Sequence, residues 1–445
     1  QSSLENLIDN YKINKTLSNN QYFKKYKNNF LSKSNLFFYI NPGRVAKSIK
    51  NSLISNFNDK IIFNNDSILK FTGLSLQMLS KKDLMLNNLS LYYEKSFKLP
   101  LKEEWLSHID TSSSMNPQLV KNHSTNEKTI LIQNNNNKLF AINSNGDQMW
   151  NLQIETKIIG NISTIDYYNN FKYQYLFNTS NMLYLIDRNG NSVEGYPKEL
   201  PNKTDLGHAL FDYNNTKRYR IIIVGIDQKI YNIDKKGKIV KGWKYINNDI
   251  NIKQTPRHFV IDSDDYIIAE SNNSNTQLLA INGSKRVDYK IGENFNGNKM
   301  TIDKSGTIYA ITNNGKLWRG DLNGNSNKIS LPKLDSSSLF LINEQQLKKK
   351  YIFTNREMLF ILDENFKEEN YFDLKSKITD LSINNYGLMI TTESKELYMI
   401  KNKKIAEGFP ININGYFNIS DIDNNGKTNI ITSKNGFIFN YELSN

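Results

Sequence analysis

Short hydrophobic runs, many of which end in Asp or Asn, recur along most of this chain. The clearest is Met182–Asp187, followed by a polar turn at Asn189 and Gly190 and a returning segment that ends at Tyr196 and Pro197. Related runs begin at residues 138, 182, 229, 277, 316, 358, 396 and 436, so successive starts lie 38 to 48 residues apart. Eight repeats of this length, built from short strands, predict a mainly β fold, an eight-bladed β-propeller. Seven blades is the alternative, if the weak unit that begins at residue 277 is irregular.

The two ends of the repeat array complement each other. The last repeat stops at Asn445 without a fourth strand, whereas residues 103–110 resemble a fourth strand with no blade before them. We therefore expect residues 103–110 to pair with residues 436–443, so that the propeller spans residues 103–445. Such closure removes two sheet edges that would otherwise pair with other chains.

The first 95 residues lack the repeat, and their pattern predicts a small basic α+β domain. Apolar residues at helical spacing favour helices over residues 4–31 and 45–56. Aromatic or alternating segments favour strands at 35–41, 68–79 and 84–93. Residues 96–102, which include Pro100, form the expected linker to the propeller.

The net charge of +13 gathers near the N-terminus. Residues 1–100 contain 15 Lys and Arg and 6 Asp and Glu, a net charge of +9. The other residues contain 42 Lys and Arg and 38 Asp and Glu. Only eight of the 57 basic residues are Arg, which disfavours the reading of nucleic-acid base edges. We therefore expect no nucleic-acid partner. Lys24, Lys25 and Lys27 form a candidate basic contact for an anionic membrane surface.

The chain contains no cysteine, which excludes disulfides, thiolate metal sites and cysteine nucleophiles in this sequence. No run reaches the roughly 18 apolar residues of a membrane span. The first residues lack the pattern of a signal peptide, so either the chain is cytosolic, or the sequence starts after a removed signal or inside a longer protein.

A short acidic segment near the C-terminus has the spacing of a calcium loop. Asp421, Asp423 and Asn425 place oxygen ligands at alternate positions before Gly426. Asn429 stands where a closing bidentate acid is needed. We therefore expect an ordinary turn and no cofactor, with Ca²⁺ as the alternative.

Two histidines fall at the starts of predicted innermost strands in consecutive blades. His208 and His258, with the adjacent Arg257, are expected to lie at one mouth of the central channel. A polar rim is the simplest interpretation, because a metal or acid–base site needs further converging groups. A ligand-binding site at this mouth is the alternative.

A sequence motif of the form Leu-Tyr-x-Ile-Asp-x-x-Gly-x-x-x-x-Gly-Trp is clearest in residues 139–150, 182–197 and 229–243. This motif resembles the PQQ-like (quinoprotein-type) β-propeller repeat. Residues 187–197 and 210–220 more closely resemble envelope proteins of AT-rich Gram-negative bacteria that carry an α/β part before the propeller. The chain is also similar in broad shape to the eight-bladed propeller lipoproteins of the outer-membrane β-barrel assembly machinery. This likeness implies a scaffold that binds partner proteins, although the lipidation cysteine is missing.

These resemblances lead to the functional expectation. We expect a non-enzymatic protein-binding scaffold in a bacterial envelope assembly, periplasmic or outer-membrane-associated after removal of a signal peptide. A quinone-dependent enzymatic propeller is the alternative. The cysteine pair with which such enzymes clamp their quinone is absent, and repeat resemblance without site residues indicates fold rather than activity.

Overall fold

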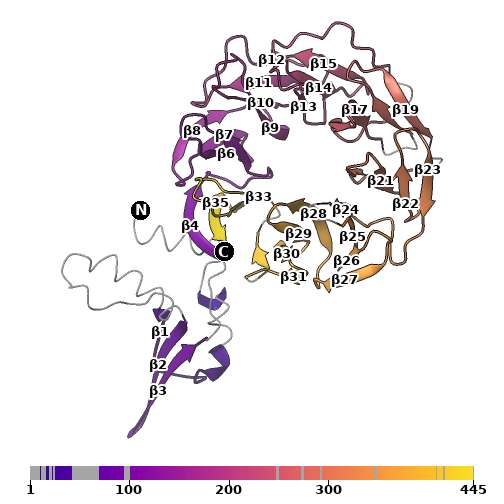
Figure 1. Ribbon diagram of the computed structural model, residues 1–445. Coiled ribbons are helices and arrows are strands. Elements are labelled where there is room, and N and C mark those ends of the chain that lie inside the picture. Colours follow the sequence, from indigo (N-terminus) through magenta and orange to yellow (C-terminus); the bar gives the residue numbers. More distant parts are fainter. Residues whose placement is uncertain are drawn as a thin grey trace. The chain divides into compact units, whose positions relative to one another are not determined.

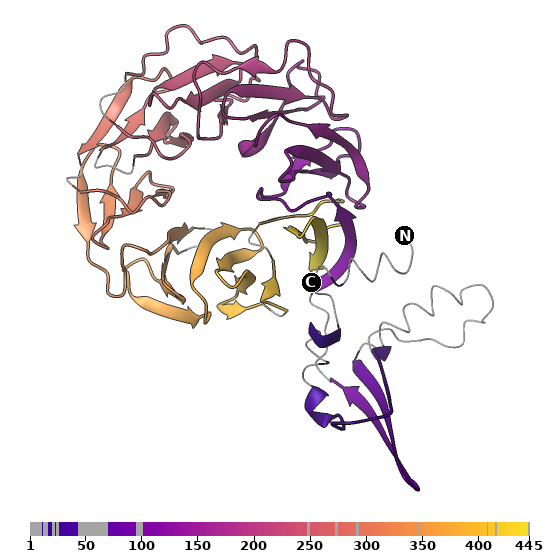
Figure 2. The same ribbon diagram turned by 180° about the vertical axis from the view of Figure 1, so that it is seen from behind.

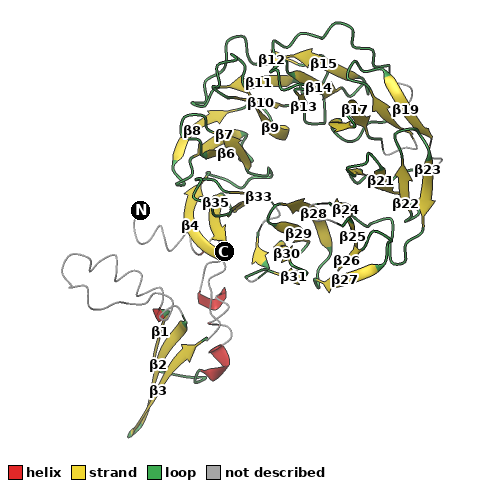
Figure 3. Ribbon diagram, in the orientation of Figure 1, coloured by secondary structure: helices red, strands yellow, loops and turns green. Residues whose placement is uncertain are grey.

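The computed structural model describes residues 11, 17–19, 23, 26–42, 70–94, 101–246, 250–271, 275–290, 293–344, 348–406, 408–413 and 416–443. The chain divides into two compact units, Gln1–Pro100 and Leu101–Leu443. Among the described residues, strands dominate both units (Figure 3). None of the described helices is long and apolar enough to cross a membrane.

The first unit contains an antiparallel sheet with the strand order β1-β2-β3. Its strands are β1 (Leu36–Ile40), β2 (Phe71–Lys81) and β3 (Leu84–Tyr93), close to the three segments expected from the sequence. Tyr26 covers one part of the sheet, where its hydroxyl bonds Thr72 Oγ1 at 2.7 Å and its ring stacks on Tyr92.

The helices predicted over residues 4–31 and 45–56 lie largely outside the described residues. Within the segment 4–31, the described residues include two 3-10 turns, η1 (Leu17–Asn19) and η2 (Lys27–Asn29). The prediction was wrong for residues 30 and 31, because Phe30 is extended and Leu31 bonds to the sheet instead. The Leu31 amide donates to Gln77 Oε1 at 2.7 Å, and Gln77 Nε2 donates back to the Leu31 carbonyl at 3.1 Å.

The described strands of the second unit form eight antiparallel sheets, as many as the repeats in the sequence. The sheets are arranged in a ring (Figure 1). In each sheet, the strand named first below lies toward the centre of the ring, and the strand named last lies toward its rim. The first four sheets are β5 (Gln118–Lys121), β6 (Lys128–Gln133), β7 (Lys138–Ile142) and β8 (Gln148–Gln153); β9 (Ile159–Ile165), β10 (Gln174–Asn178), β11 (Met182–Ile186) and β12 (Lys198–Glu199); β13 (Ala209–Phe211), β14 (Arg220–Val224) and β15 (Ile230–Asp234); and β16 (Arg257–Ile261), β17 (Asp264–Ala269), β18 (Asn275–Leu279) and β19 (Lys285–Lys290). The unit that begins at residue 277 is thus part of a four-stranded sheet, with a register shift between Leu278 and Leu279.

The remaining four sheets follow the same order around the ring. They are β20 (Thr301–Ile302), β21 (Ile308–Ile311), β22 (Leu317–Gly320) and β23 (Ser326–Ile329); β24 (Phe340–Asn343), β25 (Lys350–Asn355), β26 (Met358–Leu362) and β27 (Glu368–Asp373); β28 (Ile378–Asn384), β29 (Gly387–Thr392), β30 (Glu396–Lys401), β31 (Lys404–Ile405) and β32 (Ile411–Asn412); and β33 (Phe417–Ser420), β34 (Asn429–Lys434), β35 (Phe437–Leu443) and β4 (Leu101–His108).

Strand β4 completes the last sheet from the opposite end of the unit. It runs antiparallel to β35, with Phe437 opposite His108 and Leu443 opposite Leu101. The strand and its partner lie side by side in both views of the ring (Figures 1 and 2). Residues 101 and 102, expected in the linker, belong to β4 because the pairing continues to the end of β35.

The core lies between neighbouring sheets. Successive side chains of a strand point to opposite faces, so a middle strand of a blade serves two interfaces. In β6, Leu131 packs in a cluster with Phe177 of the next sheet, whereas Ile130 packs with Ile431 of the last sheet. This double burial explains why the middle strands are nearly continuous hydrophobic runs.

Outer-strand tryptophans join consecutive sheets at their rims. Trp105 donates from Nε1 to the Ser144 carbonyl at 2.7 Å, and its ring lies against Gly146, whose φ is +90°. Trp150 repeats the arrangement with the Arg188 carbonyl at 2.8 Å and Gly190. Glycine is required at these turns because φ is positive and a Cβ atom would strike the indole.

Candidate functional site

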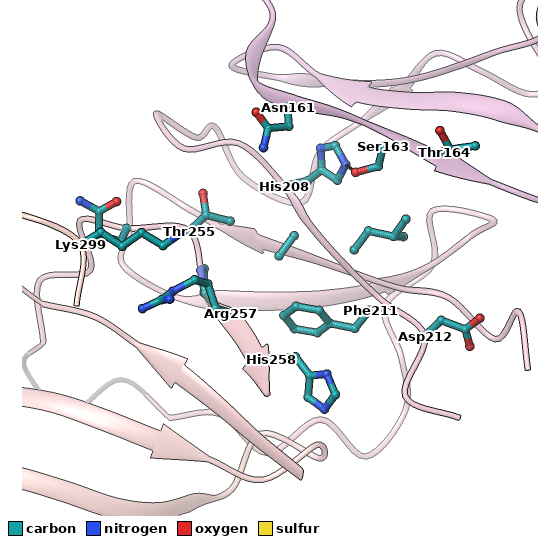
Figure 4. A pocket seen from close by; sticks show the side chains of 14 residues that line it. Asn161, Ser163, Thr164, His208, Phe211, Asp212, Thr255, Arg257, His258 and Lys299 are labelled. Atoms are coloured by element: carbon teal, nitrogen blue, oxygen red, sulfur yellow. Dashed lines mark hydrogen bonds between the residues drawn. The ribbon is translucent and has the colours of Figure 1, made fainter. Parts of the chain in front are cut away.

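A cavity of about 760 Å³ opens on the inner strands of three consecutive sheets and on the segment that leads into the innermost strand of the next sheet. Its lining includes all three residues that the sequence placed at the channel mouth, namely His208, Arg257 and His258 (Figure 4). We call it the inner-strand cavity; its other lining residues are Asn161, Ser163, Thr164, Ala209, Leu210, Phe211, Asp212, Gln254, Thr255, Pro256 and Lys299.

His208 is buried and linked to the preceding sheet through both ring nitrogens. Asn178 donates from Nδ2 to the carbonyls of Thr179 and Leu206, so its Oδ1 is free to accept. Nδ1 of His208 therefore donates to Asn178 Oδ1 at 3.1 Å, and Ser163 Oγ donates to Nε2 at 2.9 Å. The ring is held as the neutral tautomer protonated at Nδ1.

The order Ser163, His208, Asn178 has the geometry of a nucleophile, a base and an orienting group. Burial, however, lowers the pKa of His208 to about 4. A general base works best with a pKa near the operating pH, and the neutral Asn178 supplies no charge to stabilise an imidazolium. The trio therefore works as a hydrogen-bonded link between sheets, and its proton-accepting power at neutral pH is weak.

Arg257 and His258 point to separate partners. Arg257 donates from Nε and Nη2 to Glu270 Oε1 at 2.9 and 2.5 Å and from Nη2 to the Met300 carbonyl at 2.6 Å. His258 Nε2 bonds Asp265 Oδ1 at 2.6 Å, and its ring lies edge-on to Tyr213. The three predicted residues thus share a cavity without converging on one point.

Lys299 is the cavity residue that sequence reasoning missed. Among the described residues it has no carboxylate within 4.0 Å, although Glu270 and Asp380 lie within electrostatic range. Burial and then the neighbouring Arg257 lower the pKa of Lys299. Burial likewise raises the pKa of Asp380, while Lys299 opposes that rise. Lys299 precedes β20 outside any repeat motif, so no sequence signal marked it.

Of the candidate calcium residues, Asp421, Asp423 and Asn425 lie close together, whereas Asn429 is directed elsewhere. Asp421 Oδ2 accepts the Gly426 amide at 2.9 Å, and Asn425 Nδ2 donates to Asp423 Oδ2 at 2.9 Å. Asn429 begins β34, where its side chain bonds the Ile422 amide and Asn440. Throughout the described part of the chain, no three His, Asp or Glu side chains are grouped so that they could hold a metal ion.

Of the three candidate membrane contacts, only Lys27 lies within the described residues. It is an exposed residue of η2. Lys24 and Lys25 fall outside the described ranges.

A second candidate site is the turn after β9, residues 166–171, which we call the 166–171 loop. It presents two large aromatic side chains, with Tyr168 55% and Phe171 73% exposed. The fully buried carboxylate of Asp166 holds the loop by accepting the amides of Asn170 and Phe171, each at 2.9 Å. Lys217 of the next sheet's turn completes the anchor at 2.5 Å from Asp166 Oδ2.

The electrostatics of Asp166 follow from these contacts. Burial alone would raise the pKa of Asp166, but the hydrogen bonds from Lys217 and the two backbone amides outweigh burial and lower the pKa. Lys217 Nζ also lies 3.6 Å from the centre of the Phe171 ring, a cation–π contact. The loop is therefore a fixed feature of the surface.

No protein-family profile matches the chain, and no curated protein sequence matches it. Among solved structures it is similar to BamB from Moraxella catarrhalis, with 12% identity and a TM-score of 0.52 over 77% of this chain and 98% of that one. It is also similar to Sqt1 from Saccharomyces cerevisiae, with 12% identity and a TM-score of 0.56 over 77% and 100%.

A further similar structure is the dihydro-heme d1 dehydrogenase NirN in complex with DHE, with 8% identity and a TM-score of 0.51 over 76% of this chain and 79% of that one. A fold shared with a protein called a dehydrogenase and with others that are not leaves the activity undecided. The structural neighbours are β-propeller proteins, and so the fold of residues 101–443 is a β-propeller.

Proposed function

We propose that this chain is a non-enzymatic β-propeller scaffold that binds a protein partner through the 166–171 loop. The observation that carries the proposal is the presentation of Tyr168 and Phe171 to solvent on a loop anchored by a buried ion pair. Aromatic residues held in a fixed position on a surface are the usual anchors of protein interfaces.

The backbone of the loop supports a role beyond folding. Phe171 has a φ of +63°, in the left-handed region that a bulky side chain rarely adopts. The matching turn after β13 has the same hydrogen-bonding pattern, with Asp212 accepting the amide of Lys217, whose φ is +61°. The turn therefore imposes the positive φ but does not require an aromatic residue. Because the Phe171 side chain is largely exposed, folding alone does not explain why a phenylalanine stands there.

Further residues extend the contact surface beside the loop. Lys235 donates from Nζ to the Tyr167 carbonyl at 2.7 Å and to Asn169 Oδ1 at 3.1 Å, so its charge lies next to the aromatic pair. The Tyr167 and Tyr168 rings meet edge to face at 5.0 Å. A partner surface with an apolar pocket and acidic residues around it fits this combination.

The non-enzymatic part of the proposal rests on the inner-strand cavity. Its only nucleophile–base geometry, within the described ranges, uses a histidine whose pKa is lowered to about 4. The placement in a bacterial envelope assembly, periplasmic or outer-membrane-associated, rests on the sequence resemblance to envelope propellers. Contact of Lys24, Lys25 and Lys27 with an anionic membrane belongs to the same proposal.

The test compares partner capture by three forms of the full chain. Wild type, Phe171→Ala and Tyr371→Ala are used as bait on solubilised native membranes. Tyr371 is the matched control, because it is an exposed aromatic residue, 57% accessible, on the outer strand β27. A partner retained by wild type and Tyr371→Ala but lost from Phe171→Ala supports the proposal. Equal retention by all three, or no partner on any of them, overturns it.

A further inference from the structure

We propose that the inner-strand cavity binds a small polar organic ligand bearing an oxyanion, with Lys299 as the main charge partner of that anion. The cavity is separate from the 166–171 loop, and the inference does not depend on the proposed scaffold function. It follows from which groups along the cavity wall already have partners and which do not.

Most polar groups of the wall are engaged within the protein. Ser163 is bonded to His208, Thr255 Oγ1 donates to the Gly207 carbonyl at 3.0 Å, and Gln254 Nε2 donates to the Gly297 carbonyl at 3.2 Å. Both carboxylate oxygens of Asp212 accept hydrogen bonds from amides of its own turn. Asp212 lies at the opposite end of the lining from Lys299 (Figure 4).

The groups that remain include hydrogen-bond donors of the two cationic side chains in the lining, Lys299 and Arg257. Within the described residues, no hydrogen bond is formed by Lys299 Nζ, by the side-chain amide of Asn161 or by Nη1 of Arg257. Figure 4 shows Lys299 and Arg257 at the end of the cavity away from Asp212, and Asn161 on the wall beside His208; the three residues come from three different sheets or their lead-in segments. Arg257 and Lys299 are positively charged, so this end of the cavity attracts an anion.

Nearby carboxylates do not cancel this charge. Glu270 is buried, and both of its carboxylate oxygens already accept hydrogen bonds: Oε1 from Arg257, and Oε2 from the Met300 amide at 2.8 Å. Asp380 is not in an ion pair with Lys299, and its pKa is raised by burial. Arg257 is therefore balanced by Glu270, whereas Lys299, an exposed side chain on the cavity wall, has no ion-pair partner among the described residues. A bound anion would supply the opposite charge that Lys299 lacks.

The size and chemistry of the cavity define the ligand class. A volume of about 760 Å³ is far larger than an inorganic anion needs and falls in the range of organic-ligand sites, roughly 300–1,000 Å³. Five of the fourteen lining residues carry hydroxyl or amide side chains, which suits a hydroxyl-rich molecule such as a sugar. The shared chemistry is a polar molecule with a carboxylate or a phosphate.

Calorimetric titration of the full chain with three probes tests the inference. Glucuronate carries a carboxylate, glucose 6-phosphate a phosphate, and glucose neither. We expect saturable binding of at least one anionic probe, at least tenfold tighter than glucose. Lys299→Met should weaken that binding at least tenfold. Lys236→Met, at an exposed lysine in the turn after β15, is the matched control and should bind as wild type does.

The anionic probe that binds identifies the oxyanion. Binding should also weaken as the pH rises through the lowered pKa of Lys299, with Arg257, Glu270 and Asp380 as the charged groups facing it. Three results overturn the inference: no saturable binding of either anion, equal affinity for glucose, or unchanged affinity in Lys299→Met.

Discussion

The backbone amide of Phe171 donates to the fully buried carboxylate of Asp166 at 2.9 Å, in a loop that leaves the Phe171 ring 73% exposed. The carboxylate thus holds an aromatic side chain in solvent with its backbone in the left-handed region. Lys217, 51 residues further along the chain, joins the same carboxylate from the next sheet. Asp166 therefore holds both the 166–171 loop and the contact with Lys217 of the next sheet.

Replacing Asp166 with Ala should destabilise the propeller by about 2–3 kcal/mol, because two backbone amides and an ammonium lose a buried acceptor. Urea unfolding of the full chain measures the loss. Asp187→Ala is the control, since Asp187 accepts turn amides in the same way at an exposed site. A loss no larger than that of the control would show that burial of Asp166 adds nothing.

His208 should make the folded state sensitive to mild acid. Its pKa is about 4 in the folded chain and about 6.5 when unfolded, so the unfolded state binds more protons between these values. Stability should therefore fall as the pH drops from 6.5 to 4, by about 3 kcal/mol in total. Urea unfolding at pH 7.5 and 4.5 measures the difference.

His208→Gln should remove most of that pH dependence, whereas His108→Gln should keep it, because the His108 side chain is 54% exposed. The lowered pKa of Asp166 affects stability only at more acidic pH, below the range of this comparison. An unchanged slope in His208→Gln would assign the acid sensitivity to other groups.

Gly146 and Gly242 form a matched pair that tests the contact of Trp105 in the closing sheet. A Cβ on Gly146 would lie 2.6 Å from the Trp105 ring, whereas one on Gly242 has nothing within 4 Å, and both have φ near +80° to +90°. Both Gly→Ala substitutions carry the backbone strain, but only Gly146→Ala also displaces Trp105. We expect Gly146→Ala to destabilise the chain by about 1–3 kcal/mol more than Gly242→Ala does in urea unfolding. Equal losses would mean that the Trp105 contact contributes little.

Much of the ring could be predicted from the sequence because its repeats are local patterns. The eight hydrophobic runs correspond to the third strands of eight sheets among the described residues, and residues 103–108 of the expected closing strand pair with the last run. The helix expected to reach residue 31 ends early, since side-chain bonds from Gln77, distant in sequence, replace helical ones.

The site could be predicted only in part. His208, Arg257 and His258 reach one cavity because each occupies the start of an inner strand, a position that the repeat defines. Their partners Asn178, Glu270 and Asp265 were not predictable. Asn178 lies in the neighbouring sheet, and the other two pairings depend on how β17 lies against β16. Asn429 shows the converse: the spacing suggested a ligand, but the start of β34 directs its side chain to Asn440.

The central claim is that the 166–171 loop binds a protein partner, and the affinity of that purified partner for three forms of the full chain tests it most directly. Truncating an aromatic anchor of an interface typically costs about 2 kcal/mol or more. We therefore expect Phe171→Ala to weaken binding by about 30-fold. Tyr371→Ala should bind within about twofold of wild type, as expected for a residue outside the interface. Equal affinity of Phe171→Ala and wild type would contradict the claim.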